Sequence, residues 1–107
     1  MQARPNMLSP KRRRKANMSR DQDDFFSNLI TFSTFILSLN TAALIHLGEL
    51  PDPITNKKEI NLLLAKQTID TIEMLKEKTK GNLTLDEERL LNTILYELKL
   101  KFLKVAD

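Results

Sequence analysis

The sequence predicts an all-α protein in which a long apolar first helix packs on an antiparallel helical hairpin, behind a disordered N-terminal arm. Three observations support this fold class. Residues 25–47 contain no Asp, Glu, Lys or Arg. Two later segments repeat apolar residues at three- and four-residue spacing, as amphipathic helices do. The first 20 residues hold seven basic side chains and no acidic one.

Residues 1–24 form the predicted arm. Pro5, Pro10 and a scarcity of large apolar residues leave too little burial to offset the entropy of ordering. Because the arm collects basic residues, residues 21–107 hold ten basic and 14 acidic side chains, a net charge of −4. The arm is not a convincing signal peptide, and a start at Met18 is an alternative that would remove residues 1–17.

A compact basic tract lies within the arm, at Lys11, Arg12, Arg13, Arg14 and Lys15. Such a tract neutralises phosphates of nucleic acid or binds an anionic membrane surface. Neither an aromatic stacking platform nor a recognition-helix pattern accompanies it. We therefore interpret it chiefly as a solubilising tail, with binding to a polyanion as the alternative.

The three-helix domain should occupy residues 25–105. Its first helix ends before Gly48, which suits a left-handed turn, and Pro51 with Pro53 prevents continuation. Asp24 and Thr31 are alternative N-caps for its start. Seven residues share one sector of a helical wheel and form the expected core face: Phe25, Leu29, Phe32, Ile36, Leu39, Ala43 and Leu47.

The hairpin should consist of a second helix from Asn61 to Lys80 and a third that opens at Thr84. Asn61 is a plausible cap, Gly81 supplies the break, and Thr84 with Glu87 forms the capping-box pattern. The loop between these helices should have only three or four residues. The apolar stripes are Leu62, Ala65, Ile69, Ile72 and Leu75 on the second helix, and Leu91, Ile94, Leu95, Leu98, Phe102 and Val105 on the third.

A second apolar row on the first helix, away from its core face, consists of Phe26, Ile30, Leu37 and Leu44. One small hairpin should not cover both rows, so this row predicts burial by a partner chain or by lipid. A strip of hydroxyl residues also runs along the helix, at Ser27, Thr31, Thr34, Ser38 and Thr41. It either faces water or permits close packing against another helix.

Titratable residues near the first loop offer weak signals of chemistry. His46 should stabilise the end of the first helix, and Asp52 should fix the turn through its side-chain acceptor. Glu49, Asp52 and Glu59 lack the pattern of a calcium loop, so no metal is expected. With no Cys and a single His, the chain shows no recognisable catalytic set, and we expect neither an enzyme nor a cofactor.

Three segments together resemble a known family: the phenylalanine-rich stretch from Phe32 to Leu39, the turn from His46 to Pro53, and the segment from Asn61 to Thr84. The chain looks like a small bacterial family catalogued as a domain of unknown function, over about Phe32 to Phe102. This resemblance implies a helical, cytoplasmic protein and implies nothing catalytic.

These observations favour a non-catalytic interaction module that forms a homo-oligomer or binds a helical protein partner, with Phe26, Ile30, Leu37 and Leu44 as its contact row. No small-molecule substrate is indicated. The alternatives are an inner-membrane-associated protein held by the first helix, and an accessory factor that binds nucleic acid through Lys11 to Lys15.

Overall fold

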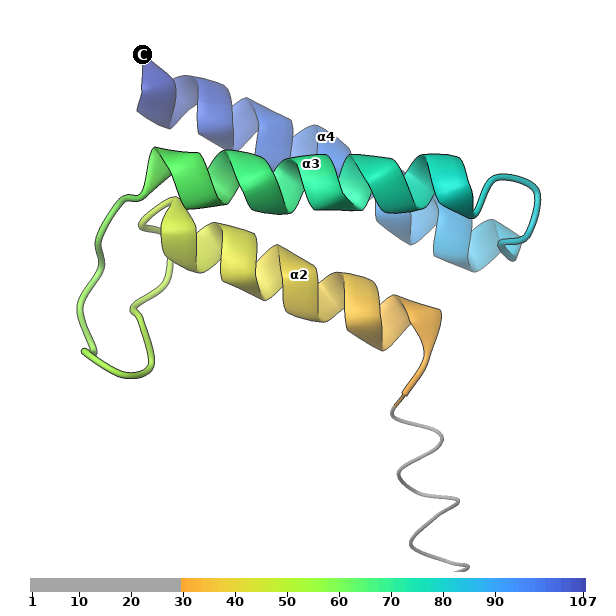
Figure 1. Cartoon of the computed structure of the whole chain (residues 1–107), viewed down its shortest axis with the longest axis horizontal. Helices are drawn as coiled ribbons and strands as arrows, with labels where there is room; N and C mark the ends of the chain where they lie inside the picture. The colour runs from red at the N-terminus through yellow and green to blue at the C-terminus, as the bar shows by residue number, and fades with distance from the viewer. Residues whose placement is uncertain (1–29) are drawn as a thin grey trace, which may run out of the picture. The chain divides into compact units, whose positions relative to one another are not determined.

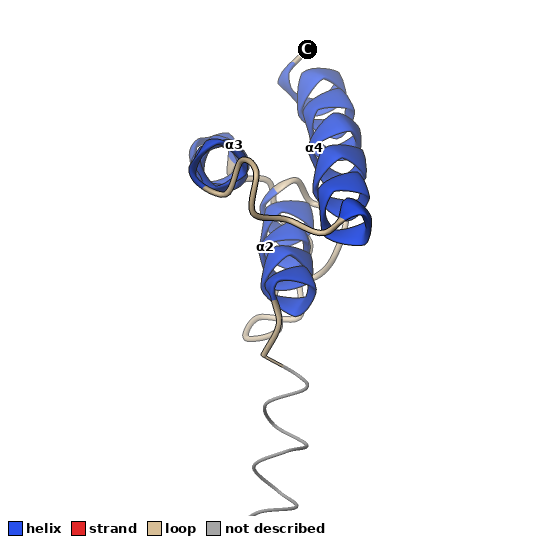
Figure 2. Ribbon diagram, turned by 90° about the vertical axis from the view of Figure 1, so that its right-hand side faces the viewer, coloured by secondary structure: helices blue, strands red, loops and turns tan. Residues whose placement is uncertain are grey.

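The computed structural model describes residues 30–107, and three helices make up this region: α2 (Phe32–His46), α3 (Leu62–Lys78) and α4 (Leu85–Ala106). Consecutive helices run in opposite directions, and each contacts both others. The α3–α4 hairpin forms one side of the bundle, and α2 lies against it (Figures 1 and 2). The predicted all-α class and the hairpin are confirmed.

The α2 helix begins at Phe32, directly after Thr31, which is the second of the two predicted start positions. Its end follows the sequence signal closely. Gly48 has a φ of +80°, and its backbone N–H donates to the carbonyl of Ile45. At the far end of the loop, Ile60 forms an isolated antiparallel bridge with Leu47, which returns the chain to the bundle.

The α3 helix has the predicted N-cap: the Asn61 side chain accepts a hydrogen bond of 3.0 Å from the Leu64 amide. The helix ends at Lys78, two residues before the predicted end, with Thr79 as its C-cap. The connection to α4 therefore runs from Thr79 to Thr84, longer than the predicted three or four residues. The helix stops where the Lys80 amide donates to the carbonyl of Glu77, three residues earlier, and Gly81 then takes a φ of +85°.

The α4 helix opens with the predicted capping box. The Glu87 amide donates to the Thr84 hydroxyl at 3.1 Å, and the Thr84 amide donates to the Glu87 carboxylate at 2.8 Å. Two otherwise unpaired amides at the helix start are satisfied in this way.

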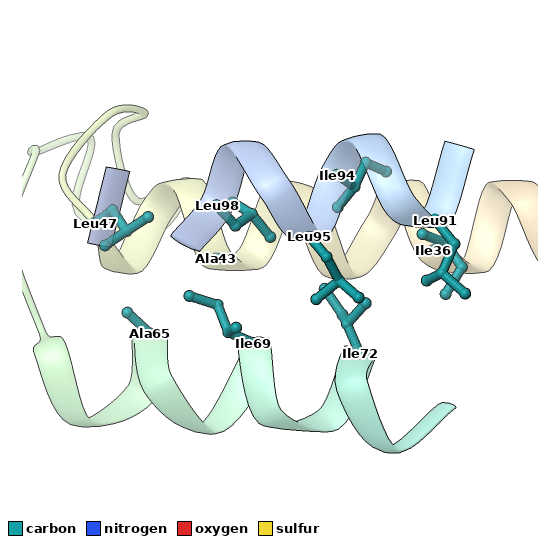
Figure 3. Packing of buried hydrophobic residues seen from close by; sticks show 10 residues of the cluster. All are labelled: Ile36, Ala43, Leu47, Ala65, Ile69, Ile72, Leu91, Ile94, Leu95 and Leu98. Carbon is teal, nitrogen blue, oxygen red and sulfur yellow. The ribbon is translucent and has the colours of Figure 1, made fainter. Parts of the chain in front are cut away.

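The core lies between the three helices and contains apolar side chains from each of them (Figure 3). Within residues 30–107, no polar or charged residue is buried. The predicted core faces are confirmed where the structure describes them, except at Leu62, which is half-buried at the start of α3 and is not part of the core cluster. The partly buried members of the predicted faces are Phe32, Leu39, Leu75, Phe102 and Val105. The buried residues are Ile36, Ala43, Leu47, Ala65, Ile69, Ile72, Leu91, Ile94, Leu95 and Leu98.

Candidate functional site

The side of α2 that faces away from α3 and α4 is an uncharged surface. We call it the outward face of α2 and define it by Thr34, Phe35, Leu37, Ser38 and Thr41, all of which are exposed. Phe35 and Leu37 are 48% and 44% exposed. The whole helix contains no Asp, Glu, Lys or Arg.

Two hydroxyl groups on this face donate to carbonyls of their own helix. Ser38 donates to the Phe35 carbonyl at 2.7 Å, and Thr41 donates to the Leu37 carbonyl at 3.1 Å. Burial of these two side chains against a partner would therefore leave no unpaired hydroxyl proton, and the cost of burying them is reduced. The described part of the hydroxyl strip faces outward from the protomer, and Ser27 lies outside the described residues.

The residues of the predicted contact row differ in their exposure to solvent. Leu37 is exposed on the outward face of α2, and Ile30, just before the helix, is 81% exposed. Leu44 is only partly buried and packs against the core of its own protomer, so a partner has less of its side chain to cover. Phe26 lies outside the described residues.

Phe35 belongs to the candidate surface but was missed in the predicted row. Phe35 and Leu37 lie at the two edges of the outward face, about 160° apart on the helical wheel. The predicted row contained apolar residues on only one side of the hydroxyl strip. Phe35 lies on its other side, and the sequence pattern would have indicated it if both sides had been considered.

By contrast, the outward surfaces of α3 and α4 carry charges. Lys66 and Asp70 form an exposed ion pair at 3.0 Å on α3, and Lys99 of α4 pairs with Glu73 of α3. These pairs border a shallow hollow of about 260 Å³ between the two helices, lined also by Ile69, Phe102 and Leu103. The lining of the hollow itself is mostly apolar, and the charged side chains lie at its edge.

The loop between α2 and α3 contains the titratable residues that the sequence singled out. Asp52 fixes the turn as predicted, because its Oδ1 atom accepts from the Ile54 amide at 2.7 Å. Glu49 instead faces Lys101 of α4, at 3.6 Å. His46 and Glu59 line a small cavity of about 140 Å³ with Asp52, together with Ile45, Asn61 and Leu64.

The backbone of His46 also closes this loop, because its carbonyl accepts from the Asn61 amide at 2.7 Å. His46 is the last residue of α2, and the sequence predicts that its side chain stabilises this end of the helix. Within residues 30–107, no group of three or more His, Cys, Asp or Glu side chains is arranged to hold a metal ion.

The predicted polyanion-binding residues, Lys11, Arg12, Arg13, Arg14 and Lys15, lie outside the described residues. Among the helices that the structure describes, none combines the length and the apolar character needed to cross a membrane.

Fold and surface together define residues 30–107 as a small bundle of three helices with an uncharged, partly apolar face on one of them. Its sequence belongs to the family described as domain of unknown function DUF1844, whose model matches residues 29–104. Comparison with curated proteins and with solved structures gives no match.

Proposed function

We propose that this protein is a non-catalytic helical interaction module that self-associates through the outward face of α2. The observation that carries the proposal is the contrast between the helices. α3 and α4 present ion pairs to solvent, whereas α2 presents exposed Phe35 and Leu37 with no charged side chain among its 15 residues. Charged residues are depleted at the centre of protein interfaces, and aromatic residues are enriched there.

The size of the domain supports the same proposal. The described region has 78 residues, and its ten buried residues form a modest core. A domain of this size buries a smaller share of its surface than a larger one, and the chain has no cysteine from which to form a stabilising disulfide. Burial of an apolar helix face against a second copy would add to its stability.

The test introduces one charge into the outward face of α2. Leu37→Asp should lower the mass measured by light scattering to that of the monomer, because a carboxylate would be desolvated at the interface. Leu103→Asp is the matched control, since Leu103 is 62% exposed on charged α4. It should leave the mass unchanged, and circular dichroism should show that both variants remain helical.

Two results would contradict the proposal. The first is a wild-type protein that stays monomeric at concentrations of tens of micromolar. The second is a Leu37→Asp variant that retains the oligomeric mass of the wild type. A melting temperature that rises with protein concentration in the wild type and not in the variant would support self-association independently.

A further inference from the structure

The loop between α2 and α3 (residues 47–61) projects beyond the end of α2. Figures 1 and 2 show it reaching past the helix on the side away from α3 and α4, which is also the side of the outward face of α2. Any partner that lies along this face therefore meets the loop at the C-terminal end of α2.

The loop is held in one shape by its own hydrogen bonds. Asp52 accepts from the Ile54 and Thr55 amides at 2.7 and 3.4 Å, and its own amide donates to the Lys57 carbonyl at 2.8 Å. The Asn56 amide donates to the Asp52 carbonyl at 2.7 Å. With Pro51 and Pro53 fixing two further φ angles, little entropy remains to be lost when this loop is covered.

This loop displays the most exposed of the large apolar side chains that the structure describes. Ile54 is 91% exposed, and Leu50, near the start of the loop, is 38% exposed. A single exposed isoleucine is ordinary on a protein surface. Here it belongs to a hydrogen-bonded loop that reaches past the end of α2.

The area of the helix face alone is too small for a stable dimer. α2 has 15 residues, so it is about 22 Å long and about 10 Å wide. Two such faces together cover on the order of 450 Å², whereas stable interfaces bury about 1,200 Å² or more. A lasting dimer through α2 must therefore extend onto neighbouring apolar surface, and Ile54 with Leu50 supplies it.

The projecting loop also selects the orientation of the pair. If two α2 helices paired in parallel, both rigid loops would lie at the same end and would obstruct each other. In an antiparallel pair, each loop lies beyond the first turn of the other α2. The helix dipoles also favour the antiparallel arrangement, because α2 carries no formal charges that could offset their repulsion in a parallel pair.

On these grounds we propose that two copies pair through antiparallel α2 helices, and that the loop of each copy packs Ile54 against the first turns of its partner's α2. This arrangement rests on the proposed self-association and adds its geometry and a second contact element. Its interface is isologous, so both loops make the same contact.

Cysteine cross-linking tests the orientation, because the chain contains no cysteine and each introduced thiol reports one position. Thr34→Cys and Thr41→Cys lie toward opposite ends of the outward face. In an antiparallel pair, a mixture of the two variants carrying different tags should give the mixed cross-link. If each variant cross-linked efficiently to itself and the mixed product were absent, the pair would be parallel and the arrangement would be overturned.

Ile54→Asp tests the loop contact. Sedimentation at a series of concentrations should show a dimer Kd raised by roughly tenfold or more, because a buried isoleucine becomes a desolvated carboxylate. Thr55→Asp, on the same loop, is a control for added charge and should change the Kd much less. An unchanged Kd for Ile54→Asp in a protein that still dimerises would refute the loop contact and leave self-association intact, whereas a monomeric wild type would refute both.

Discussion

Two glycines take left-handed backbone angles at the helix ends, and their surroundings differ. Gly48 follows α2 with a φ of +80°, and Gly81 follows α3 with a φ of +85°. A Cβ atom added at Gly48 would lie 2.9 Å from Cγ1 of Ile60, whereas one added at Gly81 would meet nothing within 4 Å. Gly48 is therefore required both by its φ angle and by the close approach of the returning chain.

Substitution of both glycines by alanine separates these two effects. Gly81→Ala should cost about 1–2 kcal/mol, the strain of a left-handed alanine. Gly48→Ala should cost more, because Ile60 must also move away from the new methyl group. Urea unfolding measures both, and equal losses of stability would show that Ile60 yields without resistance.

At the scale of the element, capping residues located the helix ends well. Asn61 and Thr84 were predicted as caps from the residue types alone, and each accepts the hydrogen bond that a cap requires. These interactions join residues three apart in sequence, so the pattern for them is local. The prediction placed the end of α3 at Lys80, directly before Gly81, whereas the helical bonding pattern already changes at Lys80, whose amide donates to the Glu77 carbonyl.

The capping box of α4 provides the test at this scale. Thr84→Ala should lower the free energy of unfolding by about 1 kcal/mol, since the Glu87 amide loses its acceptor. Thr84→Ser retains the hydroxyl oxygen and should cost a few tenths of that amount. A Thr84→Ala variant as stable as the wild type would mean that water replaces the cap at no cost.

At the scale of the whole molecule, a small set of apolar side chains links the three helices. Ile36 of α2, Ile72 of α3 and Leu98 of α4 are each completely buried. Every helix therefore contributes a side chain that its two neighbours enclose. Domains of ordinary size are stable by only about 5–15 kcal/mol, so one such residue accounts for a large share.

Substitutions of two leucines in α4 compare the stability contributed by a buried and by an exposed side chain. Leu98→Ala should cost about 2–5 kcal/mol through lost burial and the cavity left behind. Leu103→Ala, at a position 62% exposed, should stay within about 0.5 kcal/mol of the wild type. Thermal and denaturant unfolding measure both, and similar losses would place Leu103 at a contact outside the protomer.

Only part of the candidate surface could be predicted from the sequence. The uncharged character of α2 and the exposure of Leu37 were predictable, because both follow from residue types and helical spacing. Leu44 could not be separated from Leu37 in the same way. The two residues lie about 20° apart on a helical wheel, yet only Leu44 packs against the core.

For residues 30–107, the sequence by itself determined the three helices, the N-caps of α3 and α4 and most of the buried stripes, since each depends on interactions within a few residues. Only the tertiary structure decided which apolar residues of α2 stay uncovered and how far Ile54 is exposed on the loop. Those outcomes depend on how far α3 and α4 wrap around α2 and on bonds such as that from the Asn61 amide to the His46 carbonyl. Such contacts join segments distant in sequence, and no local pattern encodes them.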